Sequence, residues 1–153
     1  MGAGDAVRRN EYRLFAAWAV SMVATMGSLY FSEIKGYTPC DLCWFQRIFM
    51  YPLTIMLGIA CFRRDAGIAR YVLPLAAVGG AISLYHILYQ HFHQYWDNSL
   101  SAACGPTPCT VNYVSWFGFI TIPVMALTAF ILIILCLWRL APSTPREEDT
   151  FAE

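Results

Sequence analysis

Four long apolar stretches are the feature of the sequence that most constrains its fold. They cover residues 14–32, 42–62, 70–90 and 113–138, and each comes near the roughly 20 residues that a helix needs to cross a bilayer core of about 30 Å. With 58% hydrophobic and only 13% charged residues, the 153-residue chain is too apolar for an ordinary soluble domain. We therefore expect a single all-α membrane domain, a bundle of four transmembrane helices.

The basic residues are distributed unevenly among the segments that join these helices. Most of them lie in the N-terminal tail, the second loop and the C-terminal tail: Arg8, Arg9, Arg13, Arg63, Arg64, Arg70, Arg139 and Arg146. The first loop holds only Lys35, and positive charge favours the cytoplasmic side of a membrane. The pattern predicts a multi-pass protein with two extracytoplasmic loops and with both termini in the cytoplasm, as short disordered tails over residues 1–10 and 141–153.

Two other interpretations of the composition are weaker. An N-terminal signal peptide fits poorly, because the first apolar run exceeds the roughly 7–15 residues of a signal-peptide core and no small-x-small cleavage pattern follows it. A nucleic-acid partner is not expected, because the formal net charge is zero and no basic run with interleaved aromatic residues is found.

Two cysteines and an arginine stand where the second apolar stretch begins, in the sequence Pro39-Cys-Asp-Leu-Cys-Trp-Phe-Gln-Arg47. If a helix begins near Asp41, Cys40 occupies its N-cap, Cys43 lies in its first turn and Arg47 follows Cys43 at i+4 on the same face. The helix N-terminus and the guanidinium both favour an anion, so either sulfur could be a reactive thiolate. This arrangement indicates redox chemistry or metal binding.

The second outer loop carries another pair of cysteines, Cys104 and Cys109, with Gly-Pro-Thr-Pro between them. These turn-forming residues could bring the two Cα atoms to the roughly 5–6 Å of a disulfide. Both pairs would lie in an oxidising compartment, and two dithiols there suggest an electron relay in two stages. Cys61 and Cys136, deep in apolar sequence, are expected to be small buried hydrophobes.

His86 is the remaining candidate within an apolar stretch. It would lie about one helical turn below the outer surface, at the same depth as Arg47. An ionisable residue inside a membrane segment is either a hydrogen-bonded packing residue or part of a functional site.

Three segments resemble the DsbB family of disulfide bond formation proteins, and its short BdbC-type branch in particular. They are residues 39–47, the Tyr85-His-Ile-Leu-Tyr-Gln90 end of the third apolar stretch, and residues 109–123. The likeness covers about residues 12–138. Classical DsbB proteins have a much longer second outer loop with widely spaced cysteines, whereas here four residues separate the pair, which resembles the BdbC branch.

The resemblance implies a thiol:quinone oxidoreductase in the bacterial cytoplasmic membrane, with its redox cysteines on the extracytoplasmic side. A reduced DsbA-like thioredoxin-fold thiol oxidase would attack the Cys104–Cys109 disulfide, and the loop dithiol would then reduce Cys40–Cys43.

The same resemblance implies a membrane quinone, either ubiquinone or menaquinone, as the electron acceptor. Cys43 would pass electrons to this quinone, which Arg47 and His86 would hold. Arg47 would stabilise the thiolate and the developing quinone anion.

Two alternatives remain at this stage. One is a structural zinc site formed by the four outer cysteines Cys40, Cys43, Cys104 and Cys109. The other is a vitamin-K-epoxide-reductase-like enzyme, although in that family the Cys-x-x-Cys pair follows the loop pair in sequence and here it precedes it.

Overall fold

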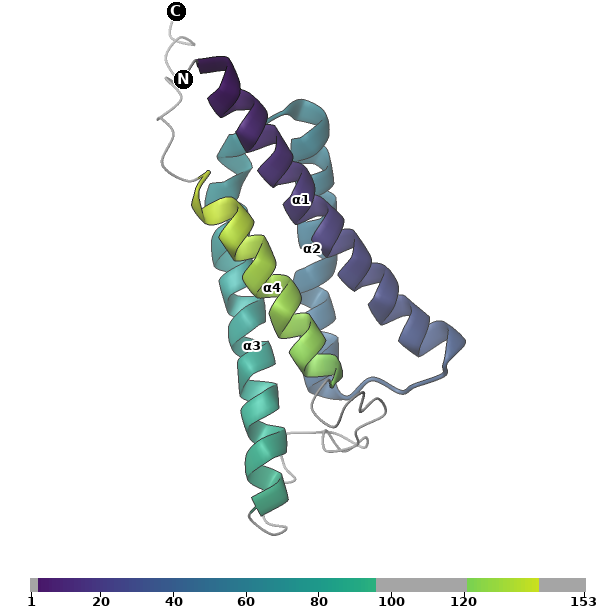
Figure 1. Cartoon of the computed structure of the whole chain (residues 1–153). Helices are drawn as coiled ribbons and strands as arrows, with labels where there is room; N and C mark the ends of the chain where they lie inside the picture. Colours follow the sequence, from purple (N-terminus) through teal and green to yellow (C-terminus); the bar gives the residue numbers. More distant parts are fainter. Residues whose placement is uncertain (1–2, 96–120, 141–153) are drawn as a thin grey trace, which may run out of the picture.

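The computed structural model describes residues 3–95 and 121–140, which form a bundle of four helices (Figure 1). The elements are α1 (Ala3–Leu29), the π-helical turn η1 (Tyr30–Ile34), α2 (Asp41–Arg63), the 3₁₀ turn η2 (Ala66–Ile68), α3 (Ala69–Tyr95) and α4 (Ile122–Trp138). Helix α1 packs on α2 and α4, and α3 packs on the same two helices. The start of α1, the α2–α3 turn and the end of α4 lie at one end of the bundle (Figure 1).

The first residues of α2 and α3 lie within one residue of the predicted helix starts. Helix α2 differs from the predicted 42–62 by one residue at each end, and α3 begins one residue before the predicted start at 70. Helix α3 continues to Tyr95, five residues beyond the predicted end at residue 90, so His91 and His93 belong to the helix. Helix α4 begins at Ile122, and residues 113–120 of the predicted fourth span lie outside the described residues.

The N-terminal segment differs from the prediction. Helix α1 begins at Ala3, so the disordered tail predicted over residues 1–10 is wrong for residues 3–10. An exposed helix tolerates polar and charged residues, and Asp5 in the first turn interacts favourably with the positive end of the helix dipole. The polarity of residues 3–10 was therefore not evidence of disorder.

The lengths and surfaces of the helices suit a lipid environment. Three described stretches are long and apolar enough to cross a membrane, Val7–Ile34, Asp41–Arg63 and Ala66–Phe92, and α4 is a shorter apolar helix. Large apolar side chains point outward from the bundle, including Phe62 at 87% exposure and Val23 at 74%. Lipid accommodates such a surface, which water would not. The fold is that of a multi-pass helical membrane protein.

Hydroxyl groups inside the bundle find partners within it. The Oγ1 atoms of Thr25 in α1 and Thr54 in α2 lie 2.9 Å apart, and Thr54 Oγ1 lies 3.3 Å from the carbonyl oxygen of Ser21. In α3, Ser83 donates to the carbonyl oxygen of Gly79 at 3.0 Å. Because hydrocarbon offers no hydrogen-bond partners, such internal bonds are required of polar groups in a membrane bundle.

Helices α3 and α4 approach closely where the fully buried ring of Phe130 faces Gly79. A Cβ atom at Gly79 would come within 2.5 Å of that ring, whereas a Cβ atom at Gly80 would lie 3.6 Å from the Cβ of Phe130, an ordinary contact. The absence of a side chain at Gly79 therefore sets the distance between the two helices.

Replacing Gly79 by alanine should destabilise the bundle. The new methyl group forces the buried Phe130 ring to move, at a cost of about 1–3 kcal/mol, which thermal unfolding in detergent would report as a lower Tm. Gly80→Ala is the matched control and should leave the Tm unchanged or raise it slightly, since alanine favours helix over glycine. Equal effects of the two substitutions would contradict this account of the α3–α4 contact.

Candidate redox site

The chain before α2 brings both cysteines of the motif to the helix start. Cys40 is the N-cap, with φ −72° and ψ 167°, and Asp41 is the first helical residue, as the sequence predicted. The N–H of Trp44 donates to the carbonyl oxygen of Cys40 at 3.0 Å. Cys43 is thus the third helical residue, and side chains at the N-cap and third positions are neighbours across the first turn.

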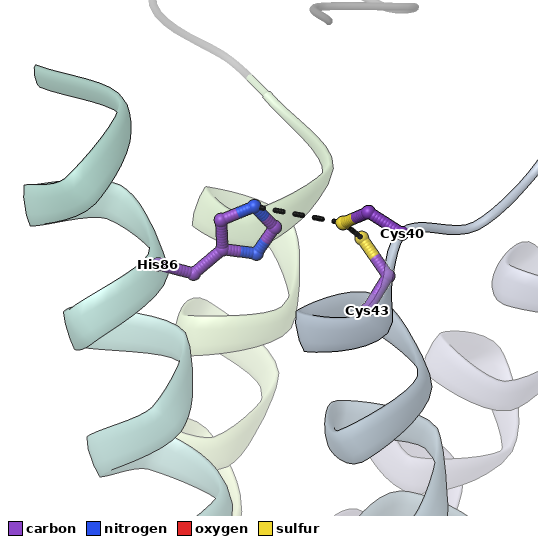
Figure 2. A group of neighbouring side chains, drawn as sticks. All are labelled: Cys40, Cys43 and His86. Carbon is purple, nitrogen blue, oxygen red and sulfur yellow. Dashed lines mark hydrogen bonds between the residues drawn. The ribbon is translucent and has the colours of Figure 1, made fainter. Parts of the chain in front are cut away.

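The two sulfur atoms lie in contact. Cys40 Sγ and Cys43 Sγ are hydrogen-bonded at 3.1 Å, and both residues are free thiols (Figure 2). A disulfide bond is about 2.05 Å long, so a movement of roughly 1 Å would convert the contact into a covalent bond. The geometry therefore suits a dithiol that opens and closes without rearrangement of α2.

His86 reaches this pair from α3. It is only 1% exposed, and its Nε2 atom points toward Cys40 Sγ at 3.9 Å (Figure 2). On the other side of the ring, Nδ1 lies 3.3 Å from Nε2 of the buried Gln46. When Gln46 donates to Nδ1, the ring proton resides on Nε2 and faces the sulfur.

Of the two sulfurs, Cys40 is the one that the surroundings favour as a thiolate. The hydrogen bond with Cys43 is the largest cause and the hydrogen bond with His86 adds to it, so that the pKa of Cys40 falls from about 9.0 to about 4. Burial of Cys40 raises the pKa, but less than these bonds lower it. The sequence left open which sulfur is activated, and it did not predict the contribution of His86.

Arg47 has two contacts that the sequence did not predict. Its guanidinium donates to the carbonyl oxygen of Ser28 in α1 at 3.1 Å and lies 5.9 Å from the centre of the Trp44 ring. These contacts link α1 to α2 and fix the cation about one turn inside the start of α2. Arg47 nevertheless lines the same cavity as the two cysteines.

A cavity of about 660 Å³ lies between the four helices and is lined in part by both cysteines. This volume is within the roughly 300–1,000 Å³ typical of small-molecule sites. Its walls are mostly apolar, and the stacked rings of Phe31 and Tyr37, 6.2 Å apart, form part of them. The polar or reactive groups that line it include Cys40, Cys43, Gln46, Arg47, His86 and Gln90. The cavity could therefore hold an apolar ring compound with its polar atoms near the sulfurs.

The structure thus gathers most of the predicted site. Cys40, Cys43 and His86 are in contact, whereas Cys104 and Cys109 lie outside the described residues. Gln46 was missed, although a polar residue three positions after Cys43 in an apolar helix was a usable signal.

The remaining two cysteines lie apart from this cluster. Cys61 and Cys136 are half-buried free thiols that pack against the hydrophobic core, so they are less buried than expected.

A dithiol at the start of a membrane helix, opening on an apolar cavity, defines a class of helical membrane proteins with a thiol redox centre. A protein-family profile described as "Disulfide bond formation protein DsbB" matches residues 10–140. The chain belongs to this DsbB family, whose disulfide-forming activity identifies it as a membrane thiol oxidoreductase.

Several relatives carry the same description. "Probable disulfide formation protein C 1" of Bacillus cereus is 53% identical over 129 residues, which cover 84% of this chain and 91% of that protein. "Disulfide bond formation protein C" of Bacillus subtilis is 50% identical over 122 residues, 80% of this chain and 87% of that protein. "Probable disulfide formation protein" of Deinococcus radiodurans is 43% identical and covers 94% of each chain. No solved structure matches the chain.

The reduced protein should hold a thiolate in mildly acidic solution. Because the pKa of Cys40 is lowered to about 4, its thiolate is present above that pH and is lost only as the pH falls through about 4. The ultraviolet thiolate absorbance of the reduced protein should therefore show a transition near pH 4, and His86→Ala should move it upward. Cys40→Ser should remove this transition, and its persistence in that variant would assign the low pKa to another group.

Proposed function

We propose that the protein is a membrane thiol:quinone oxidoreductase that re-oxidises an extracytoplasmic thioredoxin-fold protein of the DsbA type and so sustains disulfide bond formation. The observation that carries the proposal is the 3.1 Å contact between Cys40 Sγ and Cys43 Sγ at the wall of a cavity of about 660 Å³. A thiol pair beside an apolar cavity within a membrane bundle has access to a lipid-soluble oxidant. The proposal assigns the dithiol end of the bundle to the extracytoplasmic side, in agreement with the distribution of basic residues.

The first half of the proposed cycle takes place between thiols and disulfides. A thiolate of the reduced partner attacks the Cys104–Cys109 disulfide and forms a mixed disulfide with one loop cysteine. The partner's second thiol then attacks this mixed disulfide, and the loop cysteine leaves as a thiol. The partner leaves oxidised and the loop leaves as a dithiol, which reduces the Cys40–Cys43 disulfide in the same manner. Two electrons and two protons move in each exchange, and no other reductant is needed.

The second half closes the Cys40–Cys43 bond again. The Cys40 thiolate lies in contact with Cys43 Sγ and forms the S–S bond with it. As the bond forms, Cys43 loses its proton, and two electrons pass from Cys43 to an acceptor in the cavity. In the tautomer with its proton on Nε2, His86 donates to the Cys40 sulfur and stabilises its thiolate until the bond forms. Cys43, the sulfur deeper in α2, is the one that faces the acceptor in this proposal.

The cavity fits a quinone in size and chemistry. A bound ubiquinone or menaquinone supplies the acceptor for the two electrons and two protons of dithiol oxidation. Phe31 and Tyr37 offer aromatic surface to its ring. Arg47, fixed by Ser28 and Trp44, provides a positive charge within the cavity wall, where it would favour negative charge on a quinone oxygen.

Steady-state oxidation of a reduced DsbA-like protein, in detergent with added quinone, tests this proposal. Cys40→Ser and Cys43→Ser should each abolish quinone-dependent turnover, because neither variant can close the disulfide that donates electrons to the cavity. The rate of partner oxidation is measured as loss of partner thiols.

Matched controls come from the two other cysteines of the described helices. Cys61→Ser and Cys136→Ser should leave turnover near the unsubstituted rate, since both thiols pack against the core and neither lies in the cluster with His86. Normal turnover by Cys40→Ser or Cys43→Ser would contradict the proposal. Loss of turnover in a control variant would show that the redox thiols are wrongly assigned.

A further inference from the structure

We propose that Cys40, Cys43 and His86 form a three-ligand zinc site that exists only while the dithiol is reduced. The two sulfurs and one ring nitrogen of His86 all lie within 4.8 Å of one another. Thiolate and imidazole are the ligands that zinc prefers, and a site with two cysteines and one histidine leaves a fourth position open. This goes beyond the proposed function, because binding needs neither a quinone nor a protein partner.

The distances require only small shifts. Tetrahedral zinc with bonds of about 2.3 Å to sulfur and 2.0–2.1 Å to nitrogen holds its ligand atoms roughly 3.5–3.8 Å apart. The sulfur atoms are 3.1 Å apart, and Cys40 Sγ is 3.9 Å from His86 Nε2. The distance from Cys43 Sγ to the His86 nitrogen is at most 4.8 Å, so side-chain rotations that separate the sulfurs slightly and bring the imidazole closer by up to about 1 Å suffice.

Charge balance favours zinc in this buried position. Cys40 is 7% exposed and His86 is 1% exposed, so an unbalanced charge among them would be costly. Two thiolates and a neutral imidazole neutralise Zn²⁺, and any proton on the sulfurs is released to solvent. The only positive group near the cluster in the described part of the cavity wall, Arg47, is bonded to the Ser28 carbonyl.

Gln46 supplies the support that a zinc-binding histidine requires. Ligation through Nε2 places the ring proton on Nδ1, and such histidines usually donate that proton to a hydrogen-bond acceptor. The Gln46 amide lies 3.3 Å from Nδ1 and is 5% exposed. A half turn about its last side-chain bond offers the amide oxygen in place of the amide nitrogen. The same residue can therefore support either tautomer of His86.

The proposed site depends on the redox state and competes with turnover. Closing the Cys40–Cys43 disulfide removes two of the three ligands, so the oxidised protein cannot bind zinc there. Bound zinc in turn prevents disulfide closure. The fourth position faces the cavity that both cysteines and His86 line, where a water molecule would complete the tetrahedron.

A zinc titration of the reduced, full-length protein in detergent tests this proposal. Cys61, Cys104, Cys109 and Cys136 are replaced by serine so that only the two site thiols remain, and Zn²⁺ is titrated against a chromophoric chelator. One zinc should bind per reduced protein and none after the Cys40–Cys43 bond is formed. Co²⁺ in place of zinc should give thiolate-to-metal charge-transfer absorption.

Variants then test the ligand set. Gln46→Leu removes the hydrogen-bond partner of the ligand and should weaken the zinc affinity roughly 10–100-fold. His86→Ala removes the ligand itself and should weaken the zinc affinity at least as much. Gln46→Glu, which keeps an acceptor, should bind at least as tightly as the parent. His91→Ala, an exposed histidine on the same helix, is the matched control and should not change the affinity.

Three results would overturn the site: no stoichiometric zinc in the reduced protein, equal binding in the oxidised protein, or unchanged affinity in His86→Ala. The comparison of reduced with oxidised protein uses one and the same chain, so it does not depend on how well a histidine variant folds. Because the titration contains no quinone and no partner, its failure leaves the turnover experiment unaffected, and failure of turnover leaves the titration interpretable.

Discussion

The contact between His86 and the first turns of α2 is the interaction on which the rest of the site depends. A buried imidazole needs partners for both ring nitrogens, which Gln46 in α2 and the N-cap Cys40 provide, together with Gln90 of α3 at 3.5 Å from Nε2. The same contact packs α3 against α2 and keeps the ring beside the sulfur. A residue that helps to lower the pKa of Cys40 is therefore also one that links α3 to the start of α2.

The cavity follows from how the remaining contacts are arranged around that point. Arg47 bonds to the Ser28 carbonyl and so links α1 to α2 on one side of the cavity. Phe130 packs against Gly79 on another side and also lines the cavity. The polar groups that face the cavity are held in place by bonds between helices, Arg47 by the Ser28 carbonyl and His86 by Gln46.

Local features of the sequence predicted local features of the structure. The Cys-x-x-Cys spacing at a helix start was enough to predict that Cys40 and Cys43 meet, because the N-cap and third positions are neighbours in any helix. Hydrophobic runs predicted α2 almost to the residue. The helical form of residues 3–10 was not predicted, because their polarity was taken as a sign of disorder although an exposed helix is polar too.

Contacts between helices were beyond the reach of the sequence. His86 was predicted to be a candidate site residue, but its contact with Cys40 depends on the rotation of α3 about its own axis, which packing against α2 and α4 determines. The role of Gln46 has the same origin. Arg47 was expected to serve the sulfur directly, and its bond to Ser28 arises only because α1 passes beside α2.

Delivery of electrons from the dithiol at the start of α2 to an acceptor in the cavity can be measured in a single-turnover reaction. Fully reduced Cys104→Ser/Cys109→Ser protein is mixed with quinone without oxygen or partner, and quinol and disulfide are both quantified. The account predicts one quinol for each Cys40–Cys43 disulfide, mapped by mass spectrometry. Disulfide without quinol, or quinol with both thiols still free, would contradict it.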